Sequence, residues 1–133
     1  MYPADLRYSK EHEWIRVEGD KGRIGISHHA QQALGDVVFV ELPKVGRRVQ
    51  VTGGKMESVG VVESVKAVSD LYCPVSAEVV EVNTELESHP ELVNKDCYGE
   101  GWMVVVKLAN PKELDGLMDA AAYQAYLAAE GGH

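Results

Sequence analysis

Two lysines in one stretch of the chain are the first candidates for chemistry. The stretch KMESVGVVESVKAVSDLY begins with Lys55 and holds Lys66 within a β-branched run, where a charged side chain is costly unless it reaches water. Two interpretations of Lys66 are open from the residues alone: the tip of a hairpin, or a lysine that snorkels from a sheet edge. Residues 65–68 lack the Asn-Gly or Asp-Gly signal of a two-residue turn, so the pattern favours the edge lysine.

Other reactive side chains do not form a recognisable catalytic or metal-binding pattern. Cys73 and Cys97 belong to no C-x-x-C pair, and reduced thiols are expected. His28 and His29 are adjacent and point in different directions on any regular element, so we expect no metal site. The segment VTGGKMES lacks the full phosphate-loop pattern. A protein that is not an enzyme is therefore expected.

Short runs rich in valine and isoleucine dominate residues 1–109. They are EWIRVE, GRIGIS, DVVFVEL, SVGVVESV, AEVVEVN and WMVVVKL, and they predict a mainly β protein built as an antiparallel sandwich or barrel. In the last run Trp102 and Val104 share one face while Met103 and Val105 share the other, which predicts a half-buried strand.

Helices are expected to be few in the body of the chain. Ser27 can cap a helix over residues 28–34 that ends at Gly35, and Pro90 can begin a single turn. Residues 110–133 are expected to form a helical tail: Asn110, Pro111 and Glu113 fit a capped first turn, and Asp119 can cap a helix over residues 120–129. The spacing of Leu117, Ala121 and Tyr126 predicts that this tail packs on the body.

Length and charge limit the class of protein. The 133 residues fit one domain, residues 1–133. A net charge of −8 disfavours a nucleic-acid partner. No run approaches the roughly 18 apolar residues of a membrane span and the start of the chain does not resemble a signal sequence, so a soluble, cytoplasmic protein without a membrane partner is expected.

Long motifs resemble a known family in the right order. They are YSKEHEWIRVEGD, GIS..AQ.ALGDVVFVELPKVG, GVVESVKAVSDLY, PELVN, YGEGW and DAAAYQAYL. Together they resemble the H proteins of the glycine cleavage system, carriers that hold lipoic acid on a lysine. The resemblance covers nearly the whole chain and implies a lipoyl-domain-like barrel-sandwich hybrid with peripheral helices.

The family resemblance implies a function and partners. The lysine of E-S-V-K-A corresponds to Lys66, which would carry lipoic acid at a hairpin tip. The arm would take an aminomethyl group from a glycine decarboxylase that uses pyridoxal phosphate, and pass it to a tetrahydrofolate-dependent aminomethyltransferase. A dihydrolipoamide dehydrogenase would reoxidise it, and a lipoate ligase, or an octanoyltransferase with lipoyl synthase, would attach it. A relay that supplies octanoyl or lipoyl groups to other complexes is the alternative. A monomer suits such a shuttling carrier.

The same resemblance implies further site residues. Glu63 matches an acidic position read by lipoate-attaching enzymes, with an exposed strand carboxylate as the alternative role. Glu13 and Asp70 match carboxylates that contact the loaded arm, where a protonated amine would be attracted to them. Ile26 and Leu34 match apolar positions beside the arm, although each could be a core residue only.

The sequence also departs from the family pattern. Ala33 replaces a histidine that some members direct at the arm, and Ala77 replaces a usual glycine, which is tolerable if the backbone needs no positive φ there. The connection at residues 50–58 is about four residues longer than usual. Cys73 follows Lys66 closely in the sequence, and thiol exchange with the dithiolane is a hypothesis. Lys55 is expected to be a solvated loop lysine.

Overall fold

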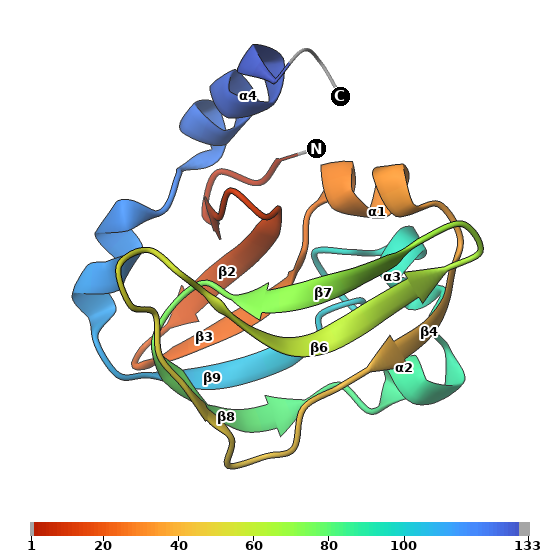
Figure 1. Ribbon diagram of the computed structural model, residues 1–133, viewed down its shortest axis with the longest axis horizontal. Coiled ribbons are helices and arrows are strands. Elements are labelled where there is room, and N and C mark those ends of the chain that lie inside the picture. Colours follow the sequence, from red (N-terminus) through yellow and green to blue (C-terminus); the bar gives the residue numbers. More distant parts are fainter. Residues whose placement is uncertain (1, 131–133) are drawn as a thin grey trace.

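Two antiparallel sheets face each other in the computed structural model, which describes residues 2–130 (Figure 1). Residues 131–133 of the predicted tail lie outside the described part. The larger sheet has six strands, in the order β1 (Arg7–Tyr8), β2 (Glu13–Glu18), β3 (Lys21–Ile26), β9 (Val104–Leu108), β8 (Ala77–Val82) and β5 (Arg48–Val49). The smaller sheet has three, in the order β4 (Val37–Glu41), β6 (Glu57–Ser64) and β7 (Val68–Cys73).

The main core lies where the inward faces of the two sheets meet. Ile15 and Ile24 of the larger sheet and Val62 and Leu71 of the smaller sheet are almost completely buried in one cluster. Along β6, Val62 and Ser64 are buried while Glu63 between them is exposed, the alternation of a strand with one solvated face. The predicted mainly β fold is therefore confirmed.

The last strand departs from the predicted alternation. It begins at Val104, and Met103 is as fully buried as Val104 although it was expected on the opposite face. Val105 is also buried, because it lies in a cross-strand row between Arg23 and Glu81, whose longer side chains flank it.

Three short helices lie together at one end of the two sheets (Figure 1). Helix α1 (His28–Leu34) has the predicted bounds: the Ser27 hydroxyl accepts a hydrogen bond from the Ala30 N–H, and Gly35 ends the helix with φ 79°. After Pro90, α3 (Leu92–Lys95) forms the predicted turn. Helix α2 (Glu85–Ser88) was not predicted.

The C-terminal segment forms the 3₁₀ helix η1 (Pro111–Gly116) and α4 (Ala120–Ala129), capped by Asn110 and Asp119 as predicted. Docking of this tail is confirmed, because Leu117 and Tyr126 are partly buried against the two core clusters, but the expected contact of Ala121 is wrong. Ala121 is exposed, and the buried face of α4 carries Ala120, Tyr123 and Leu127. They pack in a second cluster with Leu6, Tyr8 and Trp14. A helix this rich in alanine leaves its orientation to its few large side chains, and the Tyr123 ring stacks on Tyr8 at 4.6 Å between centroids.

Two further contacts involve η1 and the lengthened connection at residues 50–58. The carboxylate of Glu113 accepts hydrogen bonds from the N–H and hydroxyl of Ser76, at 2.7 and 2.8 Å, and so joins η1 to the β body. In the lengthened connection, Thr52 and Lys55 form an isolated bridge around Gly53 and Gly54, which have φ of 60° and 81°. Within residues 2–130, no helix is long and apolar enough to span a membrane.

Candidate functional site

Lys66 lies at the exposed tip of the β6–β7 hairpin (Figure 1). The Ser64 N–H donates to the Ala67 carbonyl at 2.8 Å and closes the turn. The Ser64 hydroxyl accepts hydrogen bonds from the N–H groups of Lys66 and Ala67, at 3.2 and 3.0 Å. The Ser64 side chain thus adds two hydrogen bonds to the backbone bond that closes the turn. Of the two interpretations open from the residues, the structure supports the hairpin tip.

The connection between α1 and β4 supports the tip. The Val65 N–H donates to the Asp36 carbonyl at 3.1 Å. The side chain of Asn94 in α3 holds this connection in turn: it accepts from the Val37 N–H and donates to the Gly35 carbonyl, both at 2.8 Å. Sequence reasoning did not identify Asn94. The family motif PELVN contains it, but only the fold shows that its amide reaches the backbone beside the tip.

A cavity of about 380 Å³ lies beside β7 and α1 and brings together four of the residues implied by the family resemblance, Glu13, Ile26, Leu34 and Asp70. We call it the arm cleft. Its other lining residues are Glu11, His12, His29, Ala30, Ala33, Val62, Ala67, Val68 and Ser69. Ile26 and Leu34 also belong to the main core, so the core and cleft interpretations both hold. Two larger cavities, of about 550 and 590 Å³, are lined by none of these four residues.

Glu13 is a buried carboxylate, 1% exposed, at the start of β2. Its oxygens accept hydrogen bonds from the Ser9 hydroxyl and, at 3.2 Å, from the Tyr72 N–H of β7. Burial raises the pKa of Glu13 to about 7, although these two hydrogen bonds act in the opposite direction. The group therefore changes charge near neutral pH and can bind a cation. Sequence reasoning did not identify Ser9 or Tyr72 as its partners.

Asp70 and Glu63 lie on solvent-exposed positions of the small sheet. Asp70 lies at the rim of the arm cleft, and its carboxylate accepts a hydrogen bond from the Ser58 hydroxyl at 3.0 Å. Glu63 is exposed between its cross-strand partners Phe39 and Val68. Phe39 and Val68 are 50% and 68% exposed, so apolar surface flanks Glu63 near the tip of the hairpin.

The cysteines are placed unfavourably for exchange with a group on Lys66. Cys73 is fully buried, and its thiol donates to the Val75 carbonyl. Burial raises the pKa of both Cys73 and Cys97 to about 11, so the reactive thiolate is disfavoured.

Ala77 is buried in β8 without a positive φ, so its backbone does not require glycine. No group of side chains in the described residues could hold a metal ion.

Two antiparallel sheets that present a lysine at a hairpin tip, beside a cleft with a buried carboxylate, define a lipoyl-domain-like carrier of the barrel-sandwich class. The model of the glycine cleavage H-protein family matches residues 6–130. The chain belongs to that family.

Individual relatives agree with this assignment. The chain is 66% identical over 124 residues to a glycine cleavage system H protein from Symbiobacterium thermophilum, covering 93% of this chain and 94% of that protein. It is 55% identical over 131 residues to one from Carboxydothermus hydrogenoformans, covering 98% of each. The crystal structure of the Mycobacterium marinum protein superposes with a TM-score of 0.80 at 40% identity, covering 97% of this chain and 98% of that one.

Proposed function

We propose that Lys66 carries lipoic acid through an amide bond and that this chain is the carrier of a glycine cleavage system. The observation that carries the proposal is the placement of one exposed lysine at a hairpin tip next to the arm cleft. An arm of roughly ten bonds, each near 1.5 Å, extends far enough to move between the cleft and solvent.

The residues of the cleft fit such an arm. Ile26, Leu34 and Val62 present an apolar wall, and Ala33 leaves room where a larger side chain would fill the cleft. Glu13 has only two hydrogen-bond donors to its carboxylate in a buried setting. The fit is therefore to a largely apolar group that ends in a cation.

A lipoyl group on Lys66 would supply a disulfide suited to carrying the aminomethyl group of glycine between the decarboxylase, the aminomethyltransferase and the dihydrolipoamide dehydrogenase. This chain's own residues hold and position the arm. Glu13 and Asp70 attract the amine of the loaded arm, and the apolar wall excludes water from it. Tethering on Lys66 keeps the group at high local concentration for each partner in turn.

Recognition by other enzymes would use the exposed face around the tip. A lipoate ligase or an octanoyltransferase would contact Glu63 together with Phe39 and Val68, which lie beside it. In this scheme the chain catalyses no reaction itself. The decarboxylase, the aminomethyltransferase and the dehydrogenase bind their own cofactors and visit the arm.

The proposal is tested by exchange of labelled carbon dioxide into glycine with a purified glycine decarboxylase. Lipoylated protein should support exchange, and a Lys66→Arg variant treated in the same way should not. A protein that is lipoylated on Lys66 but supports no exchange would contradict the glycine cleavage role and would favour the relay of lipoyl groups to other complexes.

A further inference from the structure

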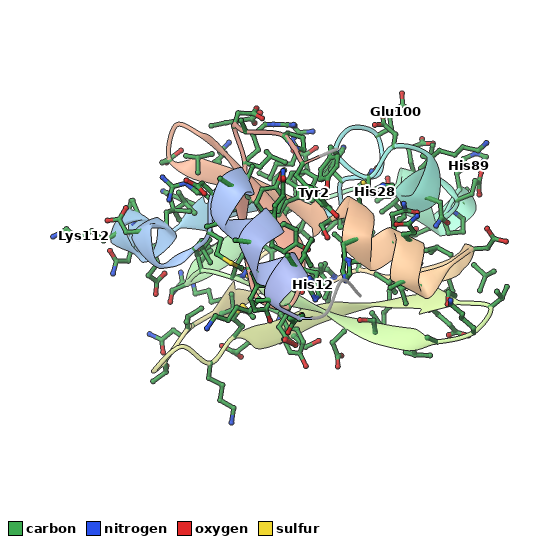
Figure 2. The ribbon with its side chains drawn as sticks, turned by 90° about the horizontal axis from the view of Figure 1, so that it is seen from above. Tyr2, His12, His28, His89, Glu100 and Lys112 are labelled. Atoms are coloured by element: carbon green, nitrogen blue, oxygen red, sulfur yellow. The ribbon has the colours of Figure 1, made fainter. Side chains whose placement is uncertain are left out.

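The hydroxyl of Tyr123 in α4 joins two elements that border the arm cleft. It lies 2.8 Å from Nδ1 of His12, just before β2, and 2.8 Å from the hydroxyl of Ser27, the N-cap of α1. His12 and Ser27 are already neighbours, because the Ser27 N–H donates to the His12 carbonyl at 2.9 Å. Figure 2 shows His12 beside α4, in keeping with the hydrogen bond between His12 and Tyr123. The Tyr123 hydroxyl thus links α4 both to the residue before β2 and to the N-cap of α1.

His12 has a backbone conformation that requires support. Its φ is 74°, and among residues 2–130 it is the one non-glycine residue with positive φ. Such a conformation costs on the order of 1 kcal/mol or more and persists where its surroundings hold it. The Tyr123 hydroxyl is the hydrogen-bond partner of the side chain. The rings of His29, 4.7 Å away, and of Tyr126, 6.2 Å away, also contact the His12 ring.

The turn that contains His12 sets the position of Glu13. The His12 N–H donates to the Ser9 carbonyl at 3.1 Å, which closes the turn. This brings the Ser9 hydroxyl to the Glu13 N–H, from which it accepts at 3.1 Å, and to the Glu13 carboxylate, to which it donates. If His12 left this conformation, Glu13 would lose its side-chain donor and gain access to water.

We propose that Tyr123 is a positioning residue for the arm cleft: by holding His12 in its left-handed conformation, it fixes the Ser9–Glu13 pair that receives the arm. This role of Tyr123 rests on the proposed function, because it assumes that Glu13 binds a cation carried on Lys66. It gives the C-terminal helix a role in the site although α4 contributes no residue to the lining of the cleft.

The test compares Tyr123→Phe with the matched control Tyr126→Phe one turn along the same helix. Tyr123→Phe removes only the hydroxyl and keeps the ring that stacks on Tyr8. The Tyr126 hydroxyl makes a long hydrogen bond to the turn before β2, 3.4 Å to the Lys10 carbonyl, and Tyr126→Phe keeps the ring beside His12. Carbon-13 NMR of the unmodified, folded protein then measures the pKa of the Glu13 carboxyl. Circular dichroism at the same temperature confirms that both variants are folded.

We expect Tyr123→Phe to lower the pKa of Glu13 by about one unit or more toward its ordinary value. Burial is the largest cause of the raised pKa, so the entry of water outweighs the loss of the Ser9 hydrogen bond, which alone would raise the pKa. Tyr126→Phe should leave the pKa unchanged. A role of Tyr123 in overall stability alone would lower the melting temperature without moving this pKa in the folded protein. An unchanged or raised pKa of Glu13 in Tyr123→Phe would overturn the proposal.

A second measurement follows the lipoylated protein loaded with the aminomethyl group. Premature release of the amine should be about fivefold faster in Tyr123→Phe than in the wild type or Tyr126→Phe. Equal release rates would contradict a role for Tyr123 in retaining the arm. Failure of the proposed function is distinguishable, because a wild type that accepts no lipoyl group on Lys66 would still give a decisive titration of Glu13.

Discussion

The hydroxyl of Ser64, the last residue of β6, accepts a hydrogen bond from the backbone N–H of Lys66 at 3.2 Å. Ser64 is buried, whereas Lys66 two residues later is exposed. The conformation of the tip therefore depends on a side chain that belongs to the strand, and the turn forms without a glycine or asparagine.

A Ser64→Ala variant should loosen the tip and slow the attachment of lipoate. Two backbone N–H groups lose their acceptor, which should cost about 1 to 2 kcal/mol of stability. The rate of attachment by a lipoate ligase, followed by intact mass, should fall several-fold. Ser69→Ala is the control, because that exposed hydroxyl makes only a marginal 3.5 Å contact with the Asp70 carbonyl. Equal rates for the two variants would contradict a positioning role for Ser64.

Removing the amide of Asn94 should destabilise the connection that holds the tip. Asn94→Ala loses the bonds to the backbone of Gly35 and Val37 and should lower the free energy of unfolding by roughly 2 kcal/mol. Urea unfolding checks this value. Gln32→Ala, a change at an exposed site on α1, should stay within about 0.5 kcal/mol of the wild type. A small effect of Asn94→Ala would show that the connection is held by other contacts.

The buried carboxyl of Glu13 should make the protein less stable as pH rises. Its pKa is about 7 in the folded state against an ordinary value of 4.5, so folding favours the protonated form. The resulting stabilisation is complete below pH 4.5 and is lost as pH rises through 7, by an amount on the order of 3 kcal/mol.

Comparison with Glu13→Gln isolates this contribution, because the variant keeps the shape of the side chain and cannot titrate. Free energies of unfolding in urea at pH 5 and pH 8 should show a larger decrease for the wild type than for the variant. Parallel behaviour of the two proteins would show that the Glu13 carboxyl is ionised in the folded state across this range.

Both cysteines should resist thiol reagents in the folded protein. Cys73 and Cys97 are buried, and their pKa values near 11 leave little thiolate at neutral pH. Iodoacetamide at pH 7.5 should modify neither residue until urea unfolds the chain, as counted by mass spectrometry. Fast labelling of Cys73 in the native protein would revive the hypothesis that it exchanges with the dithiolane.

The elements that could be predicted from the sequence are those with local signals. Helix α1 has its serine cap and terminal glycine within a few residues, and α4 begins after Asp119, so the bounds of both were predicted correctly. The contact face of α4 was predicted correctly at Tyr126 but not at Ala121. Tyr123 was missed because its contacts, Tyr8 and His12, lie at the other end of the chain. Helix α2 was not predicted, and its N-cap residue Thr84 makes no side-chain cap hydrogen bond.

The site residues also divide into those that a sequence motif indicates and those that only the folded structure brings together. Family motifs indicated Glu13, Asp70, Ile26 and Leu34, and the structure places all four on one cleft; their roles toward an arm stay predictions. The burial of Glu13 and its partner Tyr72 could not be read from the sequence, because β2 and β7 meet only in the folded chain. The hairpin tip was implied by the family resemblance but not by the residues of the turn, since the hydroxyl of Ser64 takes the place of the usual turn residues.

The most direct test of the central claim is to map the lipoyl group after incubation with a lipoate ligase, ATP and lipoate. Wild-type protein and a Lys55→Arg variant should each gain the mass of one lipoyl amide, and peptide mapping should place it on Lys66. A Lys66→Arg variant should gain nothing. Modification of Lys55, or of Lys66→Arg at any other lysine at a comparable rate, would contradict the assignment of Lys66 as the carrier residue.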